Sequence, residues 1–178
     1  MTPACMAFGG RVLTAAEVAG KRVLNVGAFD VNGSFLSLID PLGPAEYVGV
    51  DIQSGPGVDQ LCDARDLAAT FGAESWDIVI STEMLEHVED WRTVARNLKA
   101  VLRIGGLLIL TTRAPGFARH DWPGDHWRYT DADLREIFGD LEVLECTEDR
   151  ADMGAFLAAR RVGAIREPGP GFMPHLVP

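Results

Sequence analysis

The chain alternates short apolar runs with longer stretches of helical period. The apolar runs are rich in β-branched residues and end at glycine or at a polar residue, which is typical of buried strands. They cover residues 22–26 (RVLNV), 46–50 (EYVGV), 59–62, 76–80 (WDIVI), 107–112 (LLILTT), 141–146 and 154–160. Helical patterns lie between them at 34–39, 64–71, 91–102 and 131–138. Strands that alternate with helices predict a doubly wound α/β fold with helices on both faces of a parallel sheet.

The C-terminal third departs from this alternation. The connection between 141–146 and 154–160 is too short for a crossover, so we expect these two strands to be antiparallel. Residues 113–130 have no steady period, which predicts a long loop, and long ordered loops are usually functional. Residues 164–178 are rich in proline and glycine and are expected to form an irregular tail.

The composition fits one domain over residues 1–178 with a core at 21–160. The chain has a mass of 19.3 kDa and 47% hydrophobic residues, enough to build a core. Its net charge of −10 disfavours a nucleic acid partner. The three cysteines are far apart and form no CxxC motif, which fits a reducing compartment. The N-terminus has no secretory pattern and no run of eighteen apolar residues occurs, so we expect a cytoplasmic protein without a membrane partner.

Candidate binding chemistry follows the first two predicted strands. Ligands of such sheets bind beyond the carboxyl ends of the strands. Gly27 follows the first strand and permits a tight turn that a ligand can approach closely. Asp51 follows the second, where a carboxylate can accept both hydrogen bonds of a ribose diol. A helix cap or a surface carboxylate is the alternative for Asp51. Together the two residues predict a bound nucleoside.

Five segments in this order carry a family resemblance: VLNVGAFDVNGS, YVGVDI, CDARDL, WDIVISTEMLEHVED and LKAVLRIGGLLILTT. The chain resembles the class I S-adenosylmethionine (SAM)-dependent methyltransferases from about Lys21 to Arg160, especially the small bacterial type 11 group. The resemblance implies a three-layer Rossmann-like sheet of order 3-2-1-4-5-7-6, with an antiparallel strand at its C-terminal end, and SAM as the cofactor. It does not identify the methyl acceptor.

The resemblance also implies how SAM is held. The turn after the first strand would wrap the methionine end, Asp51 would hold the ribose, and Asp63 would accept from the adenine amino group. The full set is Asn25, Gly27, Ala28, Phe29, Asp30, Asp51, Ile52, Asp63, Ala64, Ser81, Thr82, Glu83 and His87. Asn25 stands where the family usually has an acidic residue and brings no charge. We therefore expect weaker cofactor binding unless Asp30 compensates.

The loop at 113–130 holds the candidate catalytic residues. His126 is a candidate general base, because histidine titrates near neutrality, or a structural histidine bonded to the loop backbone. His120 with Asp121 is a candidate oriented base or a solvated pair. These residues and Asp125 could offer metal ligands, but their spacing matches no recognised helix-borne pair, so we expect no metal. Trp127 and Tyr129 are interpreted as packing residues.

The leading hypothesis is a SAM-dependent methyltransferase that acts at O, N or C of a small molecule, such as a sugar, a lipid-linked intermediate or a secondary metabolite. One alternative is a non-catalytic binding or partner module, suggested by Asn25. Another is an NAD(P)-dependent oxidoreductase, which Phe29 disfavours because it occupies the place of the second motif glycine. Little chain lies outside the core, so we expect an open acceptor site, a small lid, or a site completed by a second subunit.

Overall fold

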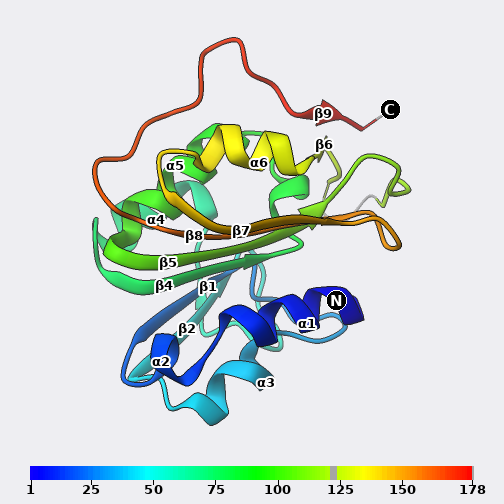
Figure 1. Cartoon of the computed structure of the whole chain (residues 1–178). Coiled ribbons are helices and arrows are strands. Elements are labelled where there is room, and N and C mark those ends of the chain that lie inside the picture. Colours follow the sequence, from blue (N-terminus) through cyan, green and yellow to red (C-terminus); the bar gives the residue numbers. More distant parts are fainter. Residues whose placement is uncertain (121–123, 178) are drawn as a thin grey trace.

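A seven-stranded sheet forms the centre of the computed structural model, which describes residues 1–120 and 124–177 (Figure 1). The strand order is β3-β2-β1-β4-β5-β8-β7. The strands are β1 (Arg22–Val26), β2 (Glu46–Asp51), β3 (Gln60–Leu61), β4 (Trp76–Thr82), β5 (Leu102–Arg113), β7 (Glu142–Asp149) and β8 (Gly154–Arg160). The first five are parallel, whereas β8 runs antiparallel to both of its neighbours. Counted within this sheet, the order is the predicted 3-2-1-4-5-7-6, and the fold class is confirmed.

Helices cover both faces of the sheet (Figure 1). One layer holds α1 (Pro3–Val12), α2 (Ala15–Val18) and α3 (Leu36–Ile39), and the other holds α4 (Leu67–Phe71), α5 (Trp91–Val101) and α6 (Asp131–Phe138). Short 3-10 turns lie at η1 (Asp40–Leu42), η2 (Ala64–Asp66) and η3 (Leu85–His87). Each layer buries its own apolar cluster against the sheet, so the sheet has a hydrophobic core on each face.

Helix α5 shows why the helical pattern predicted this arrangement. The Asp90 carboxylate caps its first turn by accepting from the Thr93 amide at 3.2 Å. Val94, Leu98 and Val101 recur on one face and are fully buried. Burial of each such side chain contributes about 1.5–3 kcal/mol, which is the main force that holds this helix on the sheet.

Both chain ends differ from the expected pattern. Helix α1 was not predicted, because Gly9 and Gly10 weaken its helical signal. Gly9 is required there, since an added Cβ would lie 2.7 Å from the Phe35 ring. The prediction of an irregular tail at 164–178 and a long loop at 113–130 was wrong at one point, where β9 (His175–Leu176) pairs with β6 (Trp127–Arg128). Neither of these two strands contains an apolar run that would predict it from the sequence, so only the folded chain reveals the pair.

The C-terminal segment lies across the α5 and α6 layer before it reaches β9 (Figure 1). Arg92 of α5 donates hydrogen bonds to the carbonyls of Pro168, Gly169 and Phe172 and so holds this segment. Lys99 lies beneath it, paired with Asp140 at 3.0 Å. Among the described residues, no helix is both long and apolar enough to cross a membrane.

Candidate active site

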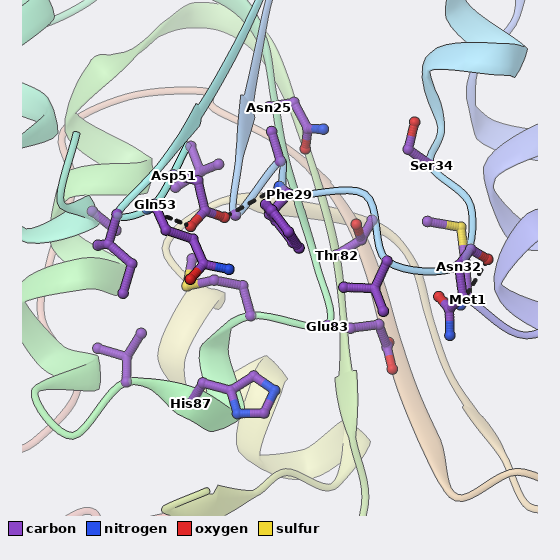
Figure 2. Close-up of a pocket in the computed structure, with 18 of the residues that line it drawn as sticks. Met1, Asn25, Phe29, Asn32, Ser34, Asp51, Gln53, Thr82, Glu83 and His87 are labelled. Carbon is purple, nitrogen blue, oxygen red and sulfur yellow. Dashed lines mark hydrogen bonds between the residues drawn. The ribbon is translucent and has the colours of Figure 1, made fainter. Parts of the chain in front are cut away.

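A cavity of about 390 Å³ opens at the carboxyl ends of β1, β2 and β4 (Figure 2). Its wall includes eleven of the thirteen residues that the resemblance assigns to SAM, namely Asn25, Gly27, Ala28, Phe29, Asp51, Ile52, Asp63, Ala64, Thr82, Glu83 and His87. The other two, Asp30 and Ser81, are not part of this wall. The fold therefore gathers most of the predicted set, from four separate segments, around one space.

Asn25 is the penultimate residue of β1, and its side chain is buried at the cavity wall. Its Nδ2 donates to the Tyr47 hydroxyl at 2.9 Å, which fixes the amide orientation. Oδ1 has no hydrogen-bond partner among the described residues. A buried acceptor without a partner is costly, so this oxygen is positioned to accept a hydrogen bond from a ligand.

The turn after β1 depends on Gly27. The amides of Gly27 and Ala28 both donate to the Val50 carbonyl, at 2.9 and 3.0 Å, which bends the chain around the end of β2. Gly27 has φ of +78°, a left-handed conformation that favours glycine. Asp30 shapes the same loop, because its Oδ1 accepts from the Gly33 amide at 2.7 Å.

Asp51 presents its carboxylate from the end of β2. Its two oxygens accept from the amides of Phe29 and Gln53, each at 3.2 Å, so the carboxylate orientation is fixed (Figure 2). Each carboxylate oxygen retains a free lone pair, which suits the two hydroxyls of a ribose diol. Ile52 beside it is 59% exposed and offers an apolar face to a flat ring.

Asp63 is already engaged by a neighbouring side chain. Arg65 donates to its Oδ2 at 2.6 Å, and this hydrogen bond holds the pKa of Asp63 below its usual range. The Asp63 carboxylate therefore stays charged and still lines the cavity. Ala64 follows it at the start of η2 and is buried against the wall.

The end of β4 and the residues after it form the opposite wall, which includes Thr82 and Glu83. Ser81, the residue before Thr82, does not line the cavity; it is fully buried and its hydroxyl has no hydrogen-bond partner among the described residues. Glu83 adopts φ of +53°, a conformation costly for a residue with a side chain and concentrated at functional sites. Its Oε2 lies 2.5 Å from Nε of Arg113, a second lining residue. Arg113 was missed because the sequence assigned it to the long loop at 113–130, whereas it is the last residue of β5.

Two histidines stand at the far end of the cavity. Their rings are 4.7 Å apart, His87 from η3 and His120 from the loop after β5. His87 Nδ1 contacts the Gly124 carbonyl, and burial lowers the pKa of His87, which favours the neutral ring. His120 Nδ1 lies 3.1 Å from Oδ2 of Asp125. Asp125 thus supplies the carboxylate that we expected from Asp121, which lies outside the described residues.

His126, the other candidate base, does not line the cavity. Its backbone amide donates to the Glu86 carbonyl at 2.9 Å and ties the loop to η3. Trp127 Nε1 donates to the Val88 carbonyl at 3.0 Å, and the Tyr129 hydroxyl donates to the Leu85 carbonyl at 3.3 Å. The loop is therefore fastened along the whole of η3.

Glu86 lies beneath the two histidines and was not predicted as a site residue. Its side chain is fully buried; Oε2 accepts from the Thr112 hydroxyl at 2.8 Å, and Oε1 has no partner among the described residues. Burial, and then the charge of Glu83, raise the pKa of Glu86 to about 8. The sequence feature that could have indicated Glu86 is its position between the apolar residue Leu85 and His87.

Comparisons with known proteins identify related chains. A family profile described as a methyltransferase domain matches residues 5–140. The chain is 33% identical over 111 residues to a ubiquinone biosynthesis O-methyltransferase of Chromobacterium violaceum, covering 54% of this chain and 46% of that protein. It is 31% identical over 127 residues to phthiotriol/phenolphthiotriol dimycocerosates methyltransferase 1 of Mycobacterium ulcerans, covering 65% and 46%. The chain thus spans about half the length of these relatives.

A solved structure shows the same fold. The 1,6-didemethyltoxoflavin-N1-methyltransferase of Burkholderia thailandensis superposes with a TM-score of 0.67 at 17% identity, over 90% of this chain and 79% of that one. That crystal contains 1,6-didemethyltoxoflavin and S-adenosylhomocysteine.

Proposed function

The chain belongs to the methyltransferase domain family, and from this premise we propose that it transfers a methyl group from SAM to a small-molecule acceptor. The observation that carries the proposal is the cavity at the ends of β1, β2 and β4, with the Asn25 oxygen, the Asp51 carboxylate and the Gly27 turn on its wall. The S-adenosylhomocysteine in the Burkholderia thailandensis structure supports the same class of cofactor.

The charge of the cavity fits this cofactor. SAM carries a sulfonium cation and an ammonium group, and the Asp51 carboxylate lines the wall without an ion-pair partner among the described residues, whereas Asp63 is paired with Arg65 and Glu83 with Arg113. An unpaired carboxylate in a cleft favours a ligand of positive charge. The Asn25 Oδ1 would accept from the ammonium group, Asp51 would hold the ribose hydroxyls, and Ile52 would cover the adenine.

SAM, when bound, supplies a methyl group on a positively charged sulfur. The task of the chain is to hold the acceptor atom in line with that methyl group, and correct positioning is worth a large part of the barrier. An acceptor hydroxyl must also lose its proton as the new bond forms. The Nε2 atoms of His87 and His120 are the groups at the cavity's far end that can serve this step.

We further propose that the acceptor is a small molecule methylated on oxygen. The relative in Chromobacterium violaceum is named an O-methyltransferase of ubiquinone biosynthesis, and the one in Mycobacterium ulcerans is named for a lipid. A sugar, a lipid-linked intermediate or a secondary metabolite would fit the same reasoning. We also propose that residues 1–178 form one domain and that a second copy of the chain completes the acceptor site.

Replacing Asp51 tests the proposal most directly. Isothermal titration calorimetry of the wild-type chain should detect SAM binding, and Asp51→Ala should weaken it about 10- to 100-fold through loss of charge-assisted hydrogen bonds. Asp51→Asn keeps the shape and should give an intermediate loss. Asp66→Ala removes an exposed carboxylate that makes no cap bond and does not line the cavity, so it should leave the affinity unchanged. If wild-type protein binds neither SAM nor S-adenosylhomocysteine, the proposal fails.

Replacing Asn25 by aspartate tests the departure from the family pattern. Asn25→Asp should raise the affinity for SAM about three- to tenfold, because a carboxylate attracts an ammonium more strongly than an amide does. It should also lower the thermal stability of the ligand-free chain, since the new charge is buried. Asn32→Asp adds the same charge at an exposed lining position and serves as the control in calorimetry. Equal or weaker binding by Asn25→Asp would contradict this role.

A further inference from the structure

We propose that Glu86, His87 and His120 bind a divalent transition-metal ion at the far end of the cavity. One ligand atom of each residue lies within 4.8 Å of the other two, and His87 Nε2 lies 4.0 Å from Glu86 Oε1. Ligands about 2.1 Å from a common ion lie at most about 4.2 Å apart, so shifts of about an ångström would close the site. The residues come from two loops, η3 and the segment after β5.

Hydrogen bonds orient both imidazoles for this role. A carbonyl oxygen can only accept, so the contact of His87 Nδ1 with the Gly124 carbonyl places the proton on Nδ1. Hydrogen bonds from Arg128 hold the Asp125 carboxylate in its charged form despite its burial, so His120 Nδ1 donates to it in the same way. With the proton on Nδ1, the free lone pair of each ring lies on Nε2. Metal-bound histidines almost always have such a second partner.

The buried carboxylate supplies an independent argument. Glu86 is fully shielded from solvent, and its Oε1 has no partner among the described residues although it lies within reach of His87. A buried carboxylate oxygen without a donor or a cation is costly. Burial therefore keeps a proton on Glu86 at neutral pH, and a metal ion beside Oε1 would displace that proton and supply the positive charge that the carboxylate needs. Its other oxygen is already fixed by Thr112, which holds Oε1 in a constant direction.

The ligand types indicate the class of ion. Two imidazoles and one carboxylate suit Zn²⁺, Fe²⁺, Co²⁺ or Mn²⁺, whereas Mg²⁺ and Ca²⁺ prefer oxygen ligands alone. Three protein ligands leave positions open, and His87 and His120 both face the cavity. An ion there would occupy the Nε2 lone pairs of His87 and His120 and would take over the deprotonation step from them. It would bind an acceptor hydroxyl and lower its pKa, so that the proton leaves to water while the oxygen attacks the methyl group. This chemical role rests on the proposed function, but binding of the ion itself does not.

The proposed set differs from the one that we considered within the loop alone. Asp125 accepts two hydrogen bonds from Arg128, and His126 does not line the cavity, so neither belongs to the set. Asp121 lies outside the described residues. The expectation of no metal concerned the spacing within one loop, whereas η3 supplies two of the three ligands here.

Metal titration of the full chain tests this site. After dialysis against a chelator, the wild-type protein should bind one equivalent of Zn²⁺ in calorimetry and one of Co²⁺ by visible absorption, with much weaker binding of Mg²⁺. His120→Ala and the isosteric Glu86→Gln should each lower Zn²⁺ affinity at least tenfold. His175→Ala removes an exposed histidine of β9 and should keep the affinity within about twofold. Circular dichroism verifies that each variant is folded.

Two results would overturn the site: less than one equivalent of ion bound by the wild-type chain, or binding that neither Glu86→Gln nor His120→Ala weakens. SAM titration of the same samples separates this proposal from the previous one. Zinc bound at these residues without SAM binding would support the metal site while contradicting the proposed function. SAM binding without zinc binding would support the proposed function and contradict the metal site.

Discussion

Gly27→Ala is expected to abolish measurable SAM binding and to lower the free energy of unfolding by about 2–5 kcal/mol. At φ of +78°, a residue with a Cβ loses about 1–2 kcal/mol. The added Cβ would also lie 2.6 Å from both Cβ and Cγ of Met84. Overpacking of this kind costs about 1–3 kcal/mol. Either the turn after β1 or the segment before η3 must move, and both line the cavity.

Gly20→Ala is the matched control for this substitution. Gly20 has φ of +68°, and an added Cβ would meet nothing within 4 Å. In this variant the free energy of unfolding should fall only by the cost of the left-handed conformation, about 1–2 kcal/mol, and SAM binding should equal that of the wild type. Urea denaturation and calorimetry measure both quantities. If the affinity of Gly27→Ala for SAM is within threefold of the wild-type affinity, the cofactor does not lie close to the backbone of this turn, and the prediction is wrong.

The parts of the site that could be predicted from the sequence are those that sit at the ends of regular strands. Gly27 and Asp51 each follow an apolar run, so the pattern that locates β1 and β2 also locates them. In a parallel sheet the carboxyl ends lie along one edge, and the two residues therefore meet at the cavity. Strand order required the family resemblance in addition, since apolar periodicity alone does not say which strands are neighbours.

The features that escaped prediction depend on contacts between distant segments. His87 and His120 were each predicted as site residues, but α5 and β5 lie between them in the chain, and no spacing rule predicts that their rings meet. Arg113 and Glu86 were not predicted as site residues, because neither belongs to a recognisable sequence pattern. Their roles follow from burial and from partners, which exist only after β4 and β5 have paired and the loop has folded onto η3.

The same loop provides the second large expected effect, because Arg128 holds it together. Its guanidinium donates to both Asp125 oxygens, at 2.5 and 2.7 Å, and to the carbonyls of Phe117, Ala118 and Trp127. The side chains of Arg128 and Asp125 are 4% and 0% exposed, so this ion pair is shielded from water. The periodicity of the sequence does not predict this ion pair, since an arginine between two aromatic residues is interpreted as an ordinary surface charge.

Arg128→Met should therefore lower the free energy of unfolding by about 3–5 kcal/mol, because it leaves the buried Asp125 carboxylate without its cation. Combining it with Asp125→Leu should recover part of that loss, since the apolar pair removes the unpaired charge but leaves the three carbonyls and the His120 amide without these partners. Arg96→Ala breaks an exposed pair with Glu167, 3.1 Å apart, and should cost less than about 1 kcal/mol. Urea denaturation measures all three variants. Hydrogen exchange at the His120 amide, which donates to Asp125 at 2.8 Å, should accelerate in both Arg128 variants and stay unchanged in Arg96→Ala. A loss below 1 kcal/mol for Arg128→Met would mean that Asp125 finds another partner, and that the loop is not held by this pair.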